Sequence, residues 1–406
     1  MPAWMLKDLC SLKVALISEE FPPYIIGGTG TFCYNLACWL SKRGVSTTVF
    51  SGGSNKLVRE KVNSYLEVVR LPCLDFPPRF IWFQLQNFST ISRQLKDCTV
   101  IHSVTPEVSP ICVYLKMKLG KPLVTSYHGV TRYEMKAFLN IPISHWTAKE
   151  FGFHVLGSPL FGTSNRLSIT NSDHIISCSY AILNELRSTY EQLNLEKSSV
   201  IYNGIDLDEI GNLERNCTTT ENTNNLTLIY YGRLYWLKGI TYLVKAFKLL
   251  LRDYPNLILK IFGEGPLRHS IQAFVCDSGL KNKVHISSQI PRNKLLKEIM
   301  KADVVALPSM REAQPISVLE AMACKKPVVV FNLPFVREYI QDSFNGLLAK
   351  AQDSKDLADK ISILLSDKRF RNKLGRNAFE YVRQHHNWDN LVDKYISVYK
   401  KVTHFC

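Results

Sequence analysis

Arg311–Val330 reads REAQPISVLEAMACKKPVVV and joins a loop, a helix and a strand. Pro315 is suited to start the helix, because the first helical position needs no backbone N–H. Glu312 precedes the helix, Glu320 lies on it, and an apolar strand begins at Pro327. A helix N-terminus can bind an anion on its amides, and carboxylates can accept hydrogen bonds from sugar hydroxyls. The alternative is a surface helix with two solvated glutamates.

Short β-branched runs alternate with amphipathic stretches on both sides of this segment. Such alternation predicts parallel sheets with right-handed crossovers. The polar run 211–225, GNLERNCTTTENTNN, predicts a linker. We therefore expect an α/β chain with two doubly wound domains and a ligand cleft where the strand ends face each other. The expected strands are 14–18, 47–51, 66–71, 100–104, 123–127, 174–179 and 200–202, then 226–231, 257–262, 284–287, 304–307, 328–331 and 346–349.

The composition of the 406 residues is typical of a soluble globular protein, with 46% hydrophobic and 21% charged residues. This length predicts two or three domains. No apolar run reaches about 18 residues, so no transmembrane helix is expected, and the start of the chain lacks a signal-peptide pattern. The 11 cysteines lack CxxC spacing. They predict core thiols, for example Cys33, Cys38 and Cys324, in a cytoplasmic protein rather than disulfides or a metal site.

The net charge of +15 indicates an anionic partner or surface. No helix-turn-helix, RNA-binding or zinc pattern accompanies it, so nucleic acid is not expected. Lys116, Lys118 and Lys121 lie close together in the half of the chain that also contains the aromatic stretch Phe80–Phe83. Basic residues beside exposed aromatics would favour peripheral contact with an anionic membrane on its cytoplasmic face. The alternative places these aromatics in the core.

Two features of the first half follow predicted strands, where α/β proteins bind ligands. Gly27-Gly28-Thr29-Gly30 opens a helix, and glycine there lets backbone amides approach a phosphate, although a plain tight turn is an equal alternative. The spacing differs from GxGxxG, which argues against a dehydrogenase. His128 ends another strand, where a hydrogen-bonded structural histidine is the alternative.

Two further features lie in the second half. Arg233 follows the first strand of that half, and Lys238 lies five residues later, at the start of the next helix. Two cations at this spacing can hold a diphosphate, whereas the alternative is an incidental basic pair. Gly263 begins the turn Gly263-Glu264-Gly265-Pro266, which also follows a strand and could be only a turn.

One known family has these motifs in the same order. From Lys13 to about Lys401 the chain resembles the retaining GT-B glycosyltransferases of family 4. The resemblance implies two Rossmann-like domains with a cleft between them. Residues 1–210 would bind the acceptor, and residues 211–384 would bind the nucleotide-sugar donor. A C-terminal helix, about 385–406, would cross back onto the first domain.

The resemblance also implies a role for each motif. Arg233 and Lys238 would stabilise the diphosphate leaving group, Glu312 would hold hydroxyls of the transferred sugar, and His128 would contact that sugar. These four are the expected catalytic residues. The expected donor-binding residues are Gly28, Gly263 and Glu320, with Glu320 on the ribose.

The expected reaction is transfer of a hexose-type sugar with retention of configuration and without a metal or other cofactor. The donor would be UDP- or GDP-linked. The acceptor would be a hydroxyl of a glycolipid, a lipid-linked glycan or an envelope glycan. All of these expectations come from the resemblance.

The chain departs from the family pattern where Lys325, Phe331 and Asn332 replace usual glycines and where Pro315 lacks an amide. These departures leave the donor sugar open. A GT-B epimerase would share the cleft, and a catalytically silent nucleotide-sugar-binding subunit would share the binding residues. A glycoside hydrolase would explain the two carboxylates but not the cationic pair.

Overall fold

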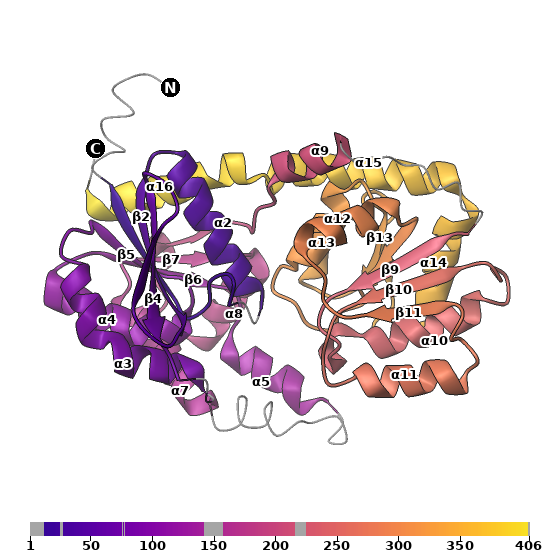
Figure 1. The fold of residues 1–406 in the computed structure, drawn as a ribbon, viewed down its shortest axis with the longest axis horizontal. Helices are drawn as coiled ribbons and strands as arrows, with labels where there is room; N and C mark the ends of the chain where they lie inside the picture. Colours follow the sequence, from indigo (N-terminus) through magenta and orange to yellow (C-terminus); the bar gives the residue numbers. More distant parts are fainter. Residues whose placement is uncertain are drawn as a thin grey trace. The chain divides into compact units, whose positions relative to one another are not determined.

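The computed structural model describes residues 12–24, 27–74, 76, 78–141, 157–215 and 225–404. These residues form two compact units (Figure 1). The first unit contains the described residues of Met1–Lys136, Ala148–Gly204 and Trp388–Cys406, and the second those of Ala137–Thr147 and Ile205–Asn387. Besides the short segment that begins at Ala137, the chain therefore leaves the first unit after Gly204 and returns to it at Trp388.

The first unit is built on an eight-stranded sheet in the order β3-β4-β2-β1-β5-β6-β7-β8. Neighbouring strands are parallel except β3 and β4, which pair antiparallel. Apart from β3 the order is doubly wound, with a topological switch point between β1 and β5. The strands are β1 (Lys13–Ser18), β2 (Ser46–Ser54), β3 (Val58–Lys61), β4 (Leu66–Pro72), β5 (Val100–Ser103), β6 (Leu123–Tyr127), β7 (His174–Ser177) and β8 (Ser198–Val200).

Helices bury both faces of this sheet. Along β1, Val14 and Leu16 contribute to one core cluster, whereas Ala15 and Ile17 contribute to another. This alternation is the two-residue period of a strand whose two faces are both covered, and it explains why the strand reads as continuously apolar. The helices of this unit are α2 (Gly28–Lys42), α3 (Arg79–Gln94), α4 (Ser109–Leu119), α7 (Ser158–Asn171), α8 (Tyr180–Thr189) and α16 (Trp388–Thr403). Helix α5 (Thr131–Leu139) begins in this unit, and its residues from Ala137 onward are assigned to the second.

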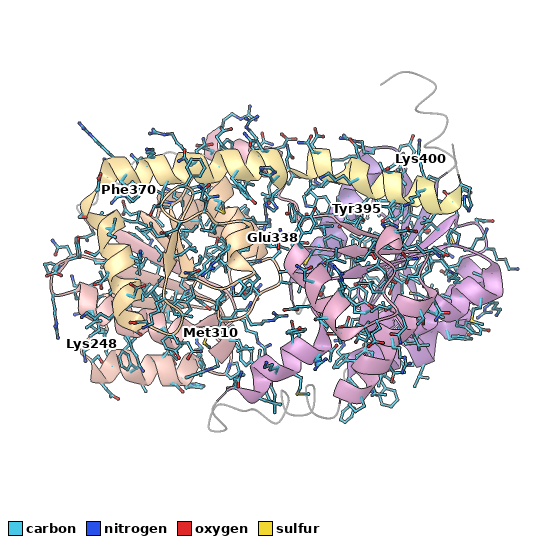
Figure 2. All side chains as sticks on the ribbon, turned by 180° about the vertical axis from the view of Figure 1, so that it is seen from behind. Lys248, Met310, Glu338, Phe370, Tyr395 and Lys400 are labelled. Atoms are coloured by element: carbon cyan, nitrogen blue, oxygen red, sulfur yellow. The ribbon has the colours of Figure 1, made fainter. Side chains whose placement is uncertain are left out.

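Helix α16 is fixed to the first unit by both apolar and polar contacts. Its Tyr395, labelled in Figure 2, belongs to the cluster that contains Phe32 of α2. The buried His102 of β5 lies 2.6 Å from Tyr399 Oη of α16 and 2.8 Å from Ser126 Oγ of β6. Burial, with a smaller effect of the neighbouring His128, lowers the pKa of His102 to about 3. The histidine is therefore a neutral link between helix and sheet.

The second unit has a six-stranded parallel sheet in the order β11-β10-β9-β12-β13-β14. This is the Rossmann strand order, with the switch point between β9 and β12. The strands are β9 (Thr227–Tyr231), β10 (Ile258–Phe262), β11 (Val284–Ser287), β12 (Val304–Ala306), β13 (Val328–Phe331) and β14 (Leu347–Ala349). The helices are α9 (Leu207–Arg215), α10 (Ile240–Leu250), α11 (Arg268–Asp277), α12 (Arg292–Lys301), α13 (Ile316–Ala323), α14 (Ser354–Ser366) and α15 (Lys368–His385).

The predicted fold class, α/β with two doubly wound domains, is confirmed, but two local predictions are wrong. Strand β3 was not expected, because its sequence VREK is polar and all its residues are exposed. The expected linker begins inside α9, because Asp206 caps that helix: its Oδ1 accepts the N–H groups of Asp208 and Glu209 at 3.1 and 3.0 Å. The rest of the linker prediction, residues 216–224, lies outside the described residues.

Phe80 and Phe83 of the expected membrane surface lie in the core, as the alternative predicted, and contact with a membrane stays a prediction. Phe80 and Phe83 are 3% and 0% exposed, because they lie on the inner face of α3 and fill the core. Lys116 donates to both carboxylate oxygens of Asp173 at 2.7 Å, so its charge is already paired. Among the described residues, no helix is long and apolar enough to cross a bilayer.

Candidate active site

The switch point of the second unit brings two loops together. Lys238 follows β9, and Glu312 follows β12. The loops are joined where the N–H of Met310, labelled in Figure 2, donates to the carbonyl of Leu237 at 2.8 Å. Gly239 makes this approach possible, because a Cβ there would lie 1.9 Å from the carbonyl oxygen of Pro308 and its φ is +66°.

Lys238 and Glu312, 74 residues apart in sequence, form an ion pair at this point. Ser309 Oγ donates to the same oxygen, Glu312 Oε1, at 3.0 Å. The Glu312 side chain is 15% exposed and that of Lys238 is 31% exposed. The pair therefore sits at the edge of the sheet, where a ligand can reach it and where partial burial strengthens its electrostatic interactions.

Arg233 lies on the same loop as Lys238, between β9 and α10, and is exposed, with its guanidinium 5.0 Å from the centre of the Tyr235 ring. The turn at Gly263 supports that loop. A Cβ on Gly263 would lie 1.9 Å from the carbonyl oxygen of Gly232, and its φ of +156° suits glycine alone. The expected glycine turn thus shapes the backbone that carries Arg233.

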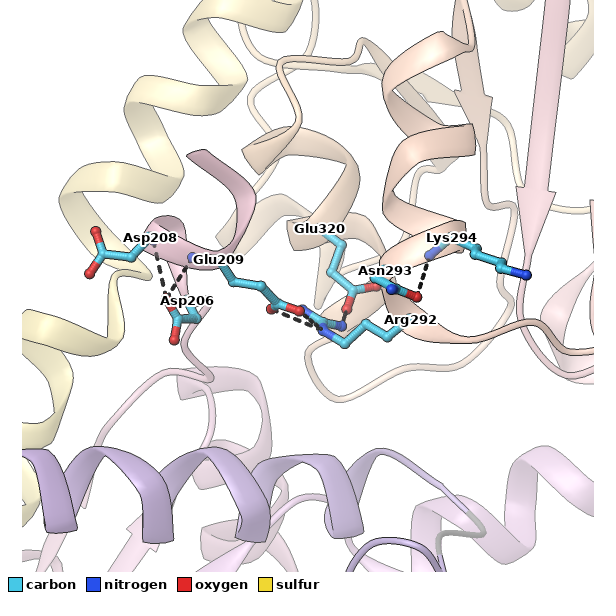
Figure 3. Close-up of polar contacts among 7 residues, drawn as sticks. All are labelled: Asp206, Asp208, Glu209, Arg292, Asn293, Lys294 and Glu320. Atoms are coloured by element: carbon cyan, nitrogen blue, oxygen red, sulfur yellow. Dashed lines mark hydrogen bonds and ion pairs between the residues drawn. The ribbon is translucent and has the colours of Figure 1, made fainter. Parts of the chain in front are cut away.

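The second glutamate of the opening motif is almost buried. Glu320 is on α13, and its side chain is 8% exposed. Arg292, the first residue of α12, donates through Nη1 to Glu320 Oε1 and through Nε to both oxygens of Glu209 on α9, at 3.2 and 3.1 Å (Figure 3). Sequence reasoning missed Arg292 because it belongs to none of the motifs. Its only signal was a cation directly after Pro291, at a helix start.

The start of α13 is held by a buried tyrosine. Tyr231, the last residue of β9, donates from Oη to the carbonyl of Ser317 at 2.5 Å. Burial and then the charge of Glu320 raise its pKa well above the usual tyrosine value. The phenol therefore stays protonated and remains a donor at neutral pH.

In the first unit, the glycine loop forms the start of α2 as expected, but one of its backbone amides already donates to a side chain of the protein. Glu20, which is 8% exposed, accepts the N–H of Gly27 at 3.1 Å and the hydroxyl of Thr29 at 3.5 Å. Gly28 itself is exposed. A phosphate contact at Gly28 remains a prediction, and the phosphate would meet the Glu20 carboxylate nearby.

His128 follows β6, and its ring lies against Phe32 of α2 with 4.3 Å between ring centres. Nε2 is buried and has no hydrogen-bond partner among the described residues. Burial lowers the pKa of His128 to about 4. The imidazole is therefore neutral at neutral pH, so it can hydrogen-bond to a sugar hydroxyl but does not supply a positive charge.

The predicted residues thus divide between the units. The second unit holds Arg233, Lys238, Gly263, Glu312 and Glu320, whereas the first holds Gly28 and His128. Among the residues that the structure describes, no three His, Cys, Asp or Glu side chains are grouped closely enough to hold a metal ion.

The sequence matches two family models that together cover most of the chain. Residues 26–209 match Glycosyltransferase Family 4, and residues 214–381 match Glycosyl transferases group 1. The chain belongs to the group 1 glycosyltransferases. The predicted family is therefore confirmed, and glycosyltransferase activity follows from it, whereas retention of configuration stays a prediction.

Relatives match this glycosyltransferase over nearly its full length. An uncharacterized glycosyltransferase of Methanocaldococcus jannaschii is 27% identical over 96% of this chain and 98% of its own. Sucrose-phosphate synthase from Thermosynechococcus elongatus is 20% identical, with a TM-score of 0.79 over 97% of this chain and 100% of its own. HepE from Anabaena, solved with UDP and glucose, is 17% identical, with a TM-score of 0.72 over 96% and 100%. The two solved structures show that the fold is GT-B.

The structure explains one departure of this glycosyltransferase from the family pattern. Lys325, where the resemblance leads us to expect glycine, has a φ of +59°, the left-handed conformation that glycine adopts most easily after a helix. Its Nζ donates to Glu214 of α9 at 2.7 and 2.9 Å. The ion pair gives the lysine a structural use at a position that otherwise favours glycine.

Proposed function

We propose that this glycosyltransferase moves a hexose-type sugar from a UDP- or GDP-linked donor to a hydroxyl acceptor with retention of configuration. The observation that carries the proposal is the ion pair of Lys238 and Glu312 at the switch point of the second unit. Ligands of doubly wound sheets bind at such points. The pair supplies a cation for a phosphate and a carboxylate for sugar hydroxyls at one place. HepE, which shares the fold, was solved with UDP and glucose.

The second unit, residues 211–384 in the sequence prediction, would be the donor domain. Arg233 and Lys238 would neutralise the diphosphate as the bond between the anomeric carbon and the phosphate oxygen breaks. The acceptor hydroxyl would attack the same face of the sugar, which retains its configuration. Glu312 would hold hydroxyls of the sugar and Glu320 the ribose, and the turn at Gly263 would lie near the nucleotide. None of these roles requires a metal.

Residues 1–210 would provide the acceptor side. His128 would donate or accept a hydrogen bond with the transferred sugar as a neutral ring, and the loop at Gly28 would approach the donor phosphate. The acceptor would be a hydroxyl of a glycan, which could be lipid-linked. With Phe80 and Phe83 buried, any attachment to an anionic membrane would depend on other residues. Sedimentation with anionic vesicles at low and high salt tests that attachment directly.

The experiment that tests the function measures release of UDP or GDP from nucleotide sugars with and without glycan acceptors. Arg233→Ala should reduce turnover and weaken nucleotide diphosphate binding by calorimetry. Arg233 is the clean choice because it is exposed, whereas removal of Lys238 also leaves the half-buried Glu312 without its cation. Lys245→Ala removes an exposed cation from α10 and should change neither quantity.

Four results would contradict the proposal. The wild type could bind neither UDP nor GDP, or Arg233→Ala could bind them unchanged. Formation of an epimerised nucleotide sugar without transfer would identify the epimerase alternative, and binding without any turnover would identify a silent subunit.

A further inference from the structure

We propose that Arg292 is a positioning residue for ribose recognition: held by Glu209, its guanidinium fixes the Glu320 carboxylate in the orientation that accepts the ribose hydroxyls. The proposal rests on the proposed function, in which Glu320 binds the ribose of the donor. It adds Arg292 of α12, a residue outside the recognised motifs, and a third helix, α9, to that subsite.

The contacts come from three helices of the second unit (Figure 3). Arg292 Nη1 donates to Glu320 Oε1, and Arg292 Nε donates to Glu209 Oε1 and Oε2 at 3.2 and 3.1 Å. A guanidinium is planar and rigid, so a carboxylate bound to one of its edges is restricted in orientation by whatever holds the other edge. Glu209 therefore aligns Arg292, and Arg292 aligns Glu320 through Oε1. This arrangement leaves Oε2 of Glu320 to accept a hydroxyl.

Burial makes the cation necessary. The Glu320 side chain is 8% exposed, whereas those of Arg292 and Glu209 are 37% and 35% exposed. A charge that is so poorly solvated is costly to bury unless an opposite charge lies beside it. Burial lowers the pKa of Arg292, but the charges of Glu320 and Glu209 and their hydrogen bonds outweigh this effect and raise it. The guanidinium therefore stays charged beside Glu320.

A second ion pair on α9 provides a control for a purely structural role of the Glu209–Arg292 bridge. Glu214, also on α9, pairs with Lys325 directly beyond α13 at 2.7 Å. That bridge also joins α9 to the α13 region, but it involves neither Glu320 nor Arg292. If Arg292 only joined helices, the two bridges would be equivalent. If Arg292 positions Glu320, only its own bridge affects recognition of ribose.

The test combines protein variants with nucleotide variants. Calorimetry compares UDP with 2′,3′-dideoxy-UDP, and GDP with 2′,3′-dideoxy-GDP, on the full chain. In the wild type the ribose form of the accepted nucleotide should bind more tightly. Arg292→Met should weaken the ribose form on the order of tenfold, the effect of a lost charge-assisted hydrogen bond, and leave the dideoxy form unchanged. Lys325→Met should change neither form.

Two milder variants keep the test informative if Arg292→Met folds poorly. Arg292→Lys keeps a positive charge beside Glu320, but the lysine ammonium lacks the planar guanidinium that binds both carboxylates. This variant should therefore keep part of the preference for the ribose nucleotide over the dideoxy nucleotide. Glu209→Gln should reduce the preference for the ribose nucleotide by roughly two- to threefold, because the neutral amide aligns Arg292 less firmly. In steady-state kinetics these variants should raise KM for the nucleotide sugar more than they lower kcat.

The possible results separate the inference from the function on which it rests. Equal weakening of ribose and dideoxy forms in Arg292→Met would show a structural role and overturn the inference, whereas tighter ribose binding would show that Arg292 blocks Glu320. A wild type that binds nucleotide without ribose discrimination would refute the role of Glu320 and the inference together. A wild type that binds neither UDP nor GDP would instead refute the proposed function itself.

Discussion

The two units share a doubly wound topology but differ in the side chains at the switch point of the sheet. In the second unit the loops after β9 and β12 form the ion pair of Lys238 and Glu312. In the first unit the loops after β1 and β5 carry Glu19, Glu20 and Glu107. Burial and the charges of Glu20 and Glu107 raise the pKa of Glu19 to about 8. One topology thus provides the place for a site, while the residues at the strand ends decide its chemistry.

The same difference extends to other buried titratable groups. The first unit buries neutral histidines: burial lowers the pKa of His128 and His174 to about 4. The second unit pairs a buried charge with a more exposed partner, as in Glu320 with Arg292 and in Arg371 with Asp303 at 3.0 Å. A buried neutral histidine makes the free energy of unfolding depend on pH. A paired charge makes it depend on the presence of the partner residue.

The largest expected effect comes from breaking a buried pair in the second unit. Arg371 is 8% exposed at its side chain and also donates to the carbonyl of Leu364 at 3.0 Å. Arg371→Met leaves Asp303 without its cation and should lower the free energy of unfolding by roughly 3–5 kcal/mol. Urea titration measures this loss. Arg383→Met, at an exposed pair on α15, should cost less than about 1 kcal/mol, and equal losses would contradict the contrast between buried and exposed pairs.

The next effect is on turnover. Glu312→Gln keeps the shape of the side chain but removes the charge next to Lys238, and it should lower kcat by roughly 10²–10³ while nucleotide affinity changes little. Glu320→Ala should instead weaken binding of the free nucleotide. Steady-state kinetics and calorimetry separate the two roles. The reverse pattern would mean that the two glutamates have exchanged positions, and Glu380→Gln, on an exposed part of α15, should change neither quantity.

The third effect concerns acid sensitivity of the first unit. The folded pKa of His174 is about 4, below its ordinary value of 6.5, so the unfolded chain binds the extra proton between these values. Its contribution to stability is therefore present above pH 6.5 and is lost as pH falls toward 4. His174→Asn should reduce the loss of unfolding free energy between pH 7 and 4.5 by roughly 2–3 kcal/mol in urea titrations. An unchanged loss would refute the low pKa.

The smallest effect has the opposite sign and comes from Glu19. Because its folded pKa of about 8 exceeds its ordinary value of 4.5, the folded chain keeps a proton that the unfolded chain has lost. Stability should therefore fall as pH rises from 4.5 to 8. Glu19→Gln should remove roughly 2 kcal/mol of the loss between pH 6.5 and 8. Glu191→Gln, at an exposed position, should leave the pH curve unchanged.

Much of the fold could be predicted because its signals are local. All the expected strands occur, and no end is shifted by more than three residues, since β-branched runs and their spacing reflect burial directly. Strand β3 was not predicted, because an exposed edge strand needs no apolar pattern. The predicted linker overlaps the end of α9, because this helix is mostly polar and depends on the cap at Asp206 and on the buried Ile210.

The sequence by itself determined the two doubly wound domains, the family and the motif residues Arg233, Lys238, Glu312 and Glu320, because these follow from local periodicity and from residues close together in the chain. Only the tertiary structure decided which distant charges meet. Arg292 reaches Glu320 and Glu209 because α9, α12 and α13 pack together, and Glu20 reaches the start of α2 because the loop after β1 folds back. Such contacts depend on packing between elements, and no local pattern encodes the distance between side chains that packing brings together.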